Sequence, residues 1–438
     1  MSLKVLKFGG SSLADAEHFR QVAKIVKEDP TRRYVVASAP GKRSKDDIKV
    51  TDMLYKCYEL ASNEEDITEI FDKIKARYDQ IITELGIDLD LSEKYEKIKH
   101  SFLHSAGRDY VASRGEYLNA LILAKYLNFE FIDAKKVIFF KENGAFDSER
   151  TNDVLRDYLM KYDHAVLPGF YGSMPNGTIK TFSRGGSDIT GSIVARAASA
   201  NVYENWTDVS GFLMADPRCI ENPKVIEEIT YKELRELSYM GATVLHEDAI
   251  FPVRYSNIPI NIRNTNRPED KGTFIVSQSD KISEDVITGI AGKTGFATIT
   301  IEKDMMNGEL GFGRKVLQVI EENGVSFEHF PSGIDTMSVV LSAKELVDKR
   351  ADIMSGICKV VNPENIFVEE NLALIAIVGR GMIKARGTAA RVFNALADAG
   401  VNIRMIDQGS SELNIIVGVD ANDYMVALQA IYDEFVKR

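Results

Sequence analysis

The sequence contains little cysteine. Its three cysteines, Cys57, Cys219 and Cys358, lie far apart and form no C-x-x-C pair. A disulfide framework or a structural zinc site needs grouped thiols, so neither is expected to hold this fold together. Unpaired thiols suit a reducing compartment, and we therefore predict a cytoplasmic protein.

Long apolar segments are also missing. The longest clearly apolar run, Leu372–Val378, is far shorter than the roughly 20 residues that cross a bilayer. The first residues, Met1–Lys4, lack the apolar region of a secretory signal. We therefore predict a soluble protein that has no membrane partner.

An excess of positive charge is absent, because the net charge is −11. Phosphate-rich polymers need a basic surface, so a nucleic-acid partner is not expected. The six histidines form no H-E-x-x-H motif and no cluster with metal-ligand spacing. For this reason no residue of the chain is predicted as a metal ligand.

The chain has enough apolar material for large cores, with 45% hydrophobic residues. At roughly 150 residues per domain, its length suggests about three domains. Short β-branched runs alternate with segments of helical periodicity until a polar stretch at 277–285. This alternation predicts an α/β domain, residues 1–284, with a mainly parallel sheet. Strands are expected at 3–8, 34–38, 165–168, 178–182 and 205–209, and helices at 16–28, over most of 48–127 and at 187–200.

The rest of the chain carries an internal repeat. The segment GVSF at 324–327 is similar to GVNI at 400–403, and other matched pairs have the same spacing. Each copy has the βαββαβ order of a ferredoxin-like unit. A repeat without gaps is hard to obtain by chance, so we predict two such units, at 285–370 and 371–438.

Two glycine pairs each stand between a strand and a helix. The first lies in KFGGSS, Lys7–Ser12, and the second in SRGGSD, Ser183–Asp188. Glycine lets backbone N–H groups approach an anion, and a helix N-terminus favours negative charge. Lys7 would add positive charge for a transferring phosphoryl group, Arg184 could grip a carboxylate with two hydrogen bonds, and Asp188 could orient a cation.

Each of these motifs also has a plain structural explanation. KFGGSS is neither a P-loop nor a dinucleotide fingerprint, and it could be a tight turn beside a solvated lysine. In SRGGSD, Ser187 or Asp188 could simply cap the helix. In SRGE, at 113–116, Ser113 and Glu116 have the spacing of a capping box, although Glu116 could instead receive a substrate ammonium group.

A further loop, TDVSGFLMADPR at 207–218, follows another predicted strand. Ligands of parallel sheets bind beyond the carboxyl ends of the strands. Asp208 could therefore meet a ribose or a base edge, and Arg218 a phosphate. The alternative is an ordinary turn, because Asp-Pro commonly begins one.

Together these segments resemble the aspartokinases of the amino-acid kinase superfamily over nearly the whole chain. The resemblance is carried, in the family's order, by KFGGSS, VVASAPG at 35–41, SRGE, FSRGGSD, the 207–218 loop and GATVLH at 241–246. It implies a three-layer α/β sandwich followed by two ACT domains. It also implies that Mg²⁺ and ATP serve to phosphorylate the β-carboxylate of L-aspartate, the first step of lysine, threonine and methionine biosynthesis.

The resemblance implies roles for individual residues. Lys7 and Asp188 would be catalytic. The aspartate pocket would be formed by Ser38, Thr51, Glu116 and Arg184, with Glu116 on the α-ammonium group and Arg184 on the α-carboxylate. The nucleotide would be bound by Lys7, Gly9, Gly10, Ser11, Thr207, Asp208, Leu213 and Arg218.

Two positions depart from the family pattern. Leu213 stands where the family often has an aromatic residue, and Thr243 where many members have lysine. Lys271 is a candidate for the missing cation. The alternatives are a non-catalytic amino-acid sensor on a decayed kinase, or a kinase of another small carboxylate.

The repeat is expected to sense an end product. In the aspartokinases that this chain resembles, such modules bind lysine or threonine, and the acids of the first copy favour L-lysine over threonine. The predicted effector residues are Met305, Gly311, Phe312, Glu328, Ser332, Asp335 and Ser338, whereas the second copy is more basic and should bind less well. Joining of units edge to edge predicts a homodimer or homotetramer, and a repeat that serves assembly alone is the alternative.

Overall fold

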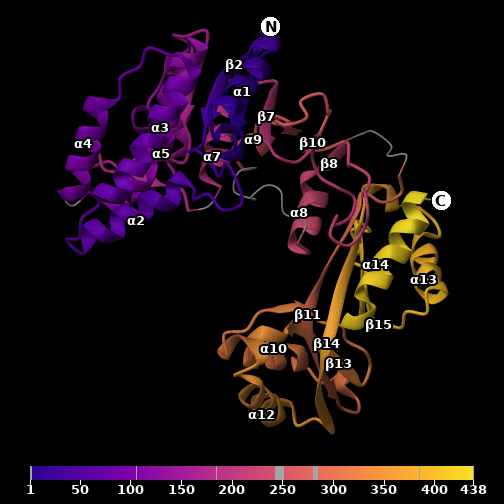
Figure 1. The fold of residues 1–438 in the computed structure, drawn as a ribbon. Helices are drawn as coiled ribbons and strands as arrows, with labels where there is room; N and C mark the ends of the chain where they lie inside the picture. Colours follow the sequence, from indigo (N-terminus) through magenta and orange to yellow (C-terminus); the bar gives the residue numbers. More distant parts are fainter. Residues whose placement is uncertain are drawn as a thin grey trace. The chain divides into compact units, whose positions relative to one another are not determined.

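The computed structural model describes residues 2–104, 106–183, 185–241, 251–279, 285–383 and 385–437, apart from the side chains of Phe251 and Lys437. The chain forms two compact units, and Figure 1 labels many of their elements. The first unit comprises Met1–Phe212, Val225–Tyr231 and Val244–Ser279. The second comprises Leu213–Lys224, Lys232–Thr243 and Asp280–Arg438.

The first unit is built on an eight-stranded sheet with the order β3-β4-β2-β1-β7-β9-β10-β8. Neighbouring strands run parallel except for β9 and β10, which confirms the predicted, mainly parallel α/β domain. The strands are β1 (Lys4–Phe8), β2 (Arg32–Ala37), β3 (Glu130–Phe131), β4 (Ala165–Pro168), β7 (Val202–Thr207), β8 (Glu228–Thr230), β9 (Ile260–Asn264) and β10 (Thr273–Val276). The strand expected at 178–182 is β6 (Ile179–Thr181), which pairs with β5 (Tyr171–Ser173) in a separate hairpin.

Helices cover both faces of this sheet, as the three-layer sandwich requires. Side chains alternate along a strand, so Leu6 and Phe8 of β1 join the core formed with α1 to α5, whereas Lys7 faces α7. The helices are α1 (Ala16–Glu28), α2 (Val50–Ser62), α3 (Thr68–Leu85), α4 (Ser92–Leu103), α5 (Arg108–Leu127), α6 (Ser148–Leu159), α7 (Gly186–Ala197) and the short α9 (Phe251–Arg254).

The second unit is built on a six-stranded antiparallel sheet with the order β12-β13-β11-β14-β16-β15. Its strands are β11 (Gly289–Glu302), β12 (Phe327–His329), β13 (Thr336–Ser342), β14 (Asn365–Val378), β15 (Ile403–Asp407) and β16 (Asn414–Asp420). Its helices are α8 (Tyr231–Tyr239, from Lys232 onward), α10 (Phe312–Glu322), α11 (Ala343–Leu346), α12 (Arg350–Val361), α13 (Thr388–Asp398) and α14 (Tyr424–Tyr432).

The predicted repeat is confirmed by matching elements. Gly311 and Gly387 are the N-caps of α10 and α13, and both have positive φ values, 77° and 83°. In this left-handed region glycine avoids the clash that a Cβ would cause, so the same residue is needed at the same point of each copy. Across the described part of the chain, no helix is both long and apolar enough to span a bilayer.

The two copies share their long strands. The first part of β11, Gly289–Lys293, pairs with Leu374–Val378 of β14, whereas its second part, Phe296–Glu302, pairs with β13 and with the first part of β14. The second copy therefore takes a strand from the first part of β11, which lies within the range predicted for the first copy. The domain limits 284/285 and 370/371 remain predictions.

Candidate functional site

A buried polar cluster lies where β1 and β7 run side by side. Their parallel register places Lys7 opposite Asn205, and both side chains reach the first turn of α7. Nζ of Lys7 lies 2.6 Å from Oδ1 of Asp188, and Nδ2 of Asn205 donates to the same oxygen at 2.9 Å. Lys7 is 7% exposed, so the solvated-lysine explanation is wrong and its charge is held in a fixed place.

Asp188 does not cap α7. The N-cap is Gly185, with φ 57°, and it makes no side-chain cap hydrogen bond. Asp188 lies in the first turn and directs its carboxylate to Lys7 instead, which is the contact expected of an acid that orients a cation. Arg184, the predicted partner of the α-carboxylate, lies outside the described residues.

The glycine pair after β1 contacts the loop after β2 through the backbone. The N–H of Gly41 donates to the carbonyl of Gly10 at 2.8 Å. A Cβ on Gly10 would lie 2.8 Å from the carbonyl oxygen of Ala39, and a Cβ on Gly41 would lie 2.6 Å from the carbonyl carbon of Gly10. Side chains at these two glycines would therefore push the loops apart. Ser11 follows in a 3-10 turn, Ser11–Leu13, before α1 begins.

The capping-box explanation for Glu116 is wrong. Helix α5 begins at Arg108 and has Gly107 as its N-cap, so Ser113 and Glu116 both lie inside the helix. The hydroxyl of Ser113 donates to the carbonyl of Tyr110 at 2.7 Å, which is a bond within the helix.

Glu116 is a buried carboxyl group with one oxygen that lacks a protein partner. It is 6% exposed, and among the described residues nothing hydrogen-bonds to Oε2. Burial raises the pKa of Glu116 to about 8, although a hydrogen bond from the N–H of Ala39 works against that rise. A group of this kind is suited to receive a cation beside the loop after β2.

Two further contacts place the predicted aspartate pocket around this loop. Asn119, one turn after Glu116, donates from Nδ2 to the carbonyl of Ser38 at 2.7 Å. Thr51 lies in the first turn of α2, and the N–H of the preceding Val50 donates to the carbonyl of Pro40. The structure thus brings Ser38, Thr51 and Glu116 to one loop, and it adds Asn119 and Asn205, which no sequence motif indicated.

Thr207 and Asp208, which are predicted to bind the nucleotide, lie at the carboxyl end of β7. The hydroxyl of Thr207 donates to Oδ1 of Asp208 at 3.2 Å, and Asp208 is exposed. Lys271 is also exposed, in the loop between β9 and β10. Its neighbour Asp270 accepts a hydrogen bond from Ser210 at 2.5 Å, so this loop is tied to the TDVSG segment.

Leu213 and Arg218 belong to the second unit. The backbone N–H and Nε of Arg218 donate to Oδ1 of Asp216 at 2.8 Å and 3.0 Å, so the Asp-Pro turn explains its present contacts. The nucleotide roles of Leu213 and Arg218 stay predictions. Thr243 lies outside the described residues.

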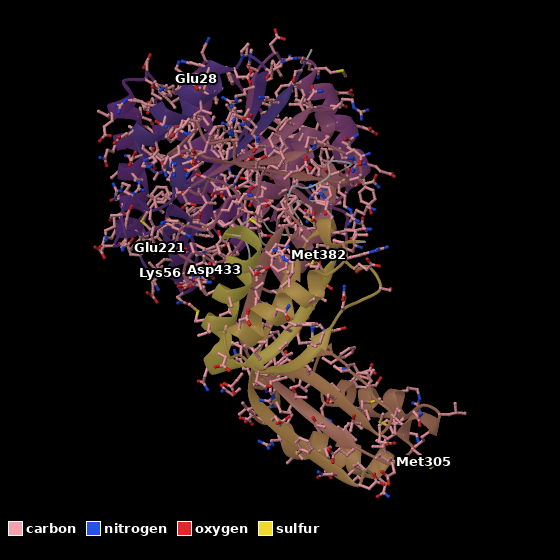
Figure 2. The ribbon with its side chains drawn as sticks, turned by 90° about the vertical axis from the view of Figure 1, so that its right-hand side faces the viewer. Glu28, Lys56, Glu221, Met305, Met382 and Asp433 are labelled. Carbon is pink, nitrogen blue, oxygen red and sulfur yellow. The ribbon has the colours of Figure 1, made fainter. Side chains whose placement is uncertain are left out.

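The loop of the first copy that carries the predicted effector residue Met305 is hydrogen-bonded to the residue just before β13. The N–H of Met305 donates to Oδ1 of Asp335 at 2.8 Å, and the Met305 side chain is exposed at the surface (Figure 2). Ser332 is exposed and Ser338 half-buried, whereas Phe312 packs into the core of the copy. Met305, Asp335 and Ser332 are therefore accessible to a ligand, and Phe312 is not.

Glu328 of β12 has a protein partner in a helix that precedes the repeat. Its carboxylate accepts a hydrogen bond from the hydroxyl of Tyr239, the last residue of α8. The same helix contacts the second copy, because Oε2 of Glu233 lies 2.9 Å from Nη1 of Arg380. Helix α8 thus contacts both copies within the second unit.

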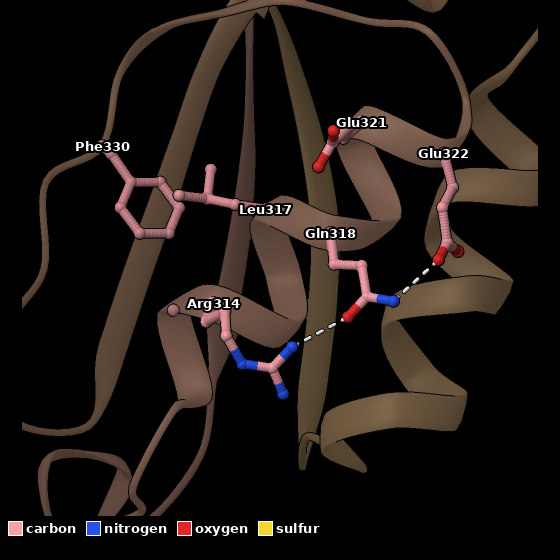
Figure 3. Close-up of a pocket in the computed structure, with 7 residues that line it drawn as sticks. Arg314, Leu317, Gln318, Glu321, Glu322 and Phe330 are labelled. Atoms are coloured by element: carbon pink, nitrogen blue, oxygen red, sulfur yellow. Dashed lines mark hydrogen bonds between the residues drawn. The ribbon is translucent and has the colours of Figure 1, made fainter.

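An open hollow lies on the outer face of α10 beside Phe330 (Figure 3). Arg314 donates to Gln318 at 2.9 Å, and Gln318 donates to Glu322 at 2.8 Å. These polar groups bind one another along the helix, and the described residues that line the hollow include none of the predicted effector residues. We assign it no ligand.

Comparison with known sequences gives matches over most of the chain. Residues 2–264 match the amino acid kinase family, and residues 375–435 match an ACT domain. The chain is 40% identical over 448 residues to aspartokinase 3 of Bacillus subtilis, covering 99% of this chain and 98% of that one. It is 29% identical to chloroplastic aspartokinase 1 of Arabidopsis thaliana, covering 98% of this chain and 80% of that one.

Solved structures show the same fold. The aspartate kinase of Clostridium acetobutylicum superposes with a TM-score of 0.91 at 52% identity, covering 99% of this chain and 100% of that one. Aspartokinase III of Escherichia coli, at 25% identity and covering 99% of both chains, gives a TM-score of 0.71 for its complex with aspartate and ADP and 0.73 for its complex with lysine and aspartate.

Proposed function

The chain belongs to the amino acid kinase family as an aspartokinase with C-terminal ACT domains, and from that premise we propose the reaction of the site described above. It transfers the γ-phosphoryl group of ATP to the β-carboxylate of L-aspartate and gives ADP and aspartyl β-phosphate. The observation that carries the proposal is the buried contact of Lys7, Asp188 and Asn205 beside a glycine loop.

The chemistry needs alignment and positive charge more than a base. A carboxylate with a pKa near 4 is already ionised at neutral pH, so the substrate itself is the nucleophile. One β-carboxylate oxygen bonds to the γ-phosphorus while the bond to the bridging oxygen of ADP breaks. Lys7 stabilises the charge on the transferring group, and Asp188 and Asn205 fix its position. Glu116 receives the α-ammonium group in the pocket that Ser38 and Thr51 line.

Mg²⁺ is proposed to enter with ATP. Among the described residues, no three His, Cys, Asp or Glu side chains are grouped so that they could hold a metal. Oδ1 of Asp188 is occupied by Lys7 and Asn205, whereas Asp208 is exposed at the end of β7. The phosphates would therefore hold the ion with Asp208 as a candidate protein ligand, and the bound ion would neutralise phosphate charge.

A substrate panel tests the proposal. We expect ADP release to require both L-aspartate and Mg²⁺. Turnover with L-glutamate should be at least about tenfold slower, because one methylene group changes recognition by about 1–3 kcal/mol. Strong turnover with glutamate, acetylglutamate or UMP would overturn the substrate assignment but not the family.

The decayed-kinase alternative predicts a different result in the same panel. It requires that no substrate gives turnover and that Thr243→Lys restores it. Appreciable activity of the natural sequence eliminates this alternative. The intact contact between Lys7 and Asp188 favours activity.

We further propose L-lysine as the allosteric effector. The support is the pair of acids in the first copy, Glu328 and Asp335, one of which is bonded to α8 and the other to the effector loop. A lysine ammonium group that binds Glu328 would compete with the hydroxyl of Tyr239. An effector acts only if it binds one conformation better than another, and loss of the α8 contact would provide such a difference.

Glu328→Ala and Asp335→Ala test the effector site. Each is expected to raise the lysine concentration for half-inhibition at least about tenfold, which corresponds to about 1.4 kcal/mol. Turnover without lysine should stay within about twofold of the wild type. Glu322→Ala, on the outer face of α10, is the matched control and should leave inhibition unchanged. If calorimetry detects neither lysine nor threonine binding, the repeat serves assembly instead.

A homodimer or homotetramer formed through the repeat also stays a proposal. Its support is the edge strand β12, which leaves Phe327 45% exposed, and the exposed Leu310 and Ile334 in neighbouring loops of the same copy. The cytoplasmic location and the place in lysine, threonine and methionine biosynthesis are proposals that follow from the family.

A further inference from the structure

Arg77 of α3 lies outside every motif described above, yet its guanidinium group makes four hydrogen bonds within the first unit. The residue is 4% exposed. Nε and Nη2 donate to the carbonyl of Ala14 at 3.2 Å and 3.0 Å, Nη2 donates to the carbonyl of Gly41 at 2.8 Å, and Nη1 lies 2.7 Å from Oδ2 of Asp47.

The two carbonyl groups belong to the two loops that form the site. Ala14 closes the 3-10 turn that follows the glycine pair of β1. Gly41 lies in the loop that runs from Ser38 to the start of α2 at Val50, and its own N–H donates to the carbonyl of Gly10 in the first loop. One buried side chain thus donates hydrogen bonds to both loops, close to the point where the two loops contact each other.

We propose that Arg77 is a positioning residue for phosphoryl transfer, which sets the distance between the phosphate loop (Gly9–Ala14) and the aspartate loop (Ser38–Gly41). In-line transfer needs the reacting atoms about 3–3.5 Å apart, and a misplacement of about 1 Å can cost about 100-fold in rate. A planar guanidinium group can bond to three acceptors at fixed angles, whereas an ammonium group cannot reproduce that geometry. The proposal rests on the kinase function proposed above.

The competing explanation is that Arg77 only stabilises the fold as a buried ion pair. Arg32 provides the matched control, because it is 6% exposed and its Nε lies 2.9 Å from Oε2 of Glu204. It also donates to the carbonyl of Ile25 at 2.6 Å. Arg32 stands at the start of β2, at the opposite end of the strand from Ser38, so it contacts neither loop of the site.

The test compares Arg77→Lys with Arg32→Lys in the full-length protein. For Arg77→Lys, kcat should fall about 100-fold. Each loop should still bind its own substrate, but the two loops are no longer held at the distance that transfer requires. Binding of aspartate and of Mg·ADP, each titrated alone by calorimetry, should stay within about threefold. Arg32→Lys should lower Tm but keep kcat within about twofold.

A kcat of folded Arg77→Lys close to that of Arg32→Lys would overturn the proposal. If Arg77→Lys does not fold, Arg77→Ala is assayed with guanidinium chloride, which should raise kcat at least about fivefold over equal sodium chloride. Failure of that rescue assigns Arg77 to stability alone and also overturns the proposal. If the wild type shows no turnover, the kinase function has failed, whereas an active wild type with an equally active Arg77→Lys refutes only the role of Arg77.

Discussion

Lys7→Ala is expected to lower kcat about 100- to 1,000-fold while the KM values for ATP and aspartate change by less than about fivefold. Removal of one preorganised group that stabilises transition-state charge costs about that much in other enzymes. The charge of Lys7 is fixed by Asp188 and Asn205 before substrates arrive, so it does not have to be reorganised during transfer. An interaction used mainly in the transition state lowers kcat more than it raises KM.

Lys4→Ala is the control for this prediction, because Lys4 lies on the same strand. Its Nζ is 2.9 Å from Oδ2 of Asp29, and its side chain is 26% exposed, at the other end of β1. Its replacement should leave kcat within about twofold of the wild type. Steady-state kinetics on both variants decides the matter, and a kcat of Lys7→Ala within threefold of the wild type would remove Lys7 from the mechanism.

Glu116→Gln is expected to raise the KM for aspartate about 100-fold and to change kcat much less. The loss of one partner from a buried, hydrogen-bonded charge pair costs about 2–5 kcal/mol, and about 3 kcal/mol corresponds to this factor. Glutamine keeps the size of the side chain but offers no negative charge to the α-ammonium group. The measurement is aspartate saturation at fixed Mg·ATP, supported by direct titration of aspartate.

The pH dependence of aspartate binding gives a second measure of the same carboxyl group. Burial raises the pKa of Glu116 to about 8 in the free protein, so at lower pH the proton must leave before the ammonium group can pair. The KM for aspartate should therefore fall by up to about tenfold for each pH unit from about 6 to 8 and then level off. In Glu116→Gln this slope should disappear.

The stability of the protein should show the opposite trend with pH. The folded protein holds the Glu116 proton with a pKa of about 8, against an ordinary value of 4.5, so this group's contribution to stability is lost as pH rises between these values. Tm of the wild type should therefore fall more steeply across that window than Tm of Glu116→Gln.

The control for the role of Glu116 in aspartate binding is Glu204→Gln. This substitution removes a buried carboxylate already paired with Arg32 and should leave the aspartate KM unchanged. An unchanged KM in Glu116→Gln would contradict the substrate role.

Much of this architecture follows from local patterns. Alternation along Lys4–Phe8 is enough to predict that Lys7 and Phe8 face opposite sides of a strand, and two glycine pairs at strand ends mark the site edge. The matched glycines of the repeat, Gly311 and Gly387, predict equivalent helix starts because both positions need the same backbone conformation. Such features depend on a few neighbouring residues, so a single sequence suffices.

The remaining features depend on contacts between distant parts of the chain. Asn205 matters because the β1–β7 register sets it opposite Lys7, and Arg77 matters because α3 packs behind two loops. Neither position carries a local signal. The capping-box spacing of Ser113 and Glu116 misled because α5 begins five residues before Ser113, at Arg108. Asn119 differs, because a polar residue one turn after Glu116 in an otherwise apolar segment of α5 is a local signal.

The strand shared between the copies has a consequence for how the protein is made. During synthesis, Gly289–Lys293 leaves the ribosome well before its partner Leu374–Val378 exists. Until then, the backbone N–H and C=O groups that pair with that partner have no strand to bond to. The C-terminal copy cannot close its sheet until almost the entire chain has been translated. A transplanted sensor built from 371–438 would lack a strand, whereas one that starts at 285 would carry it. For the same reason, ribosome stalling inside the repeat should leave nascent chains that are unusually prone to chaperone capture.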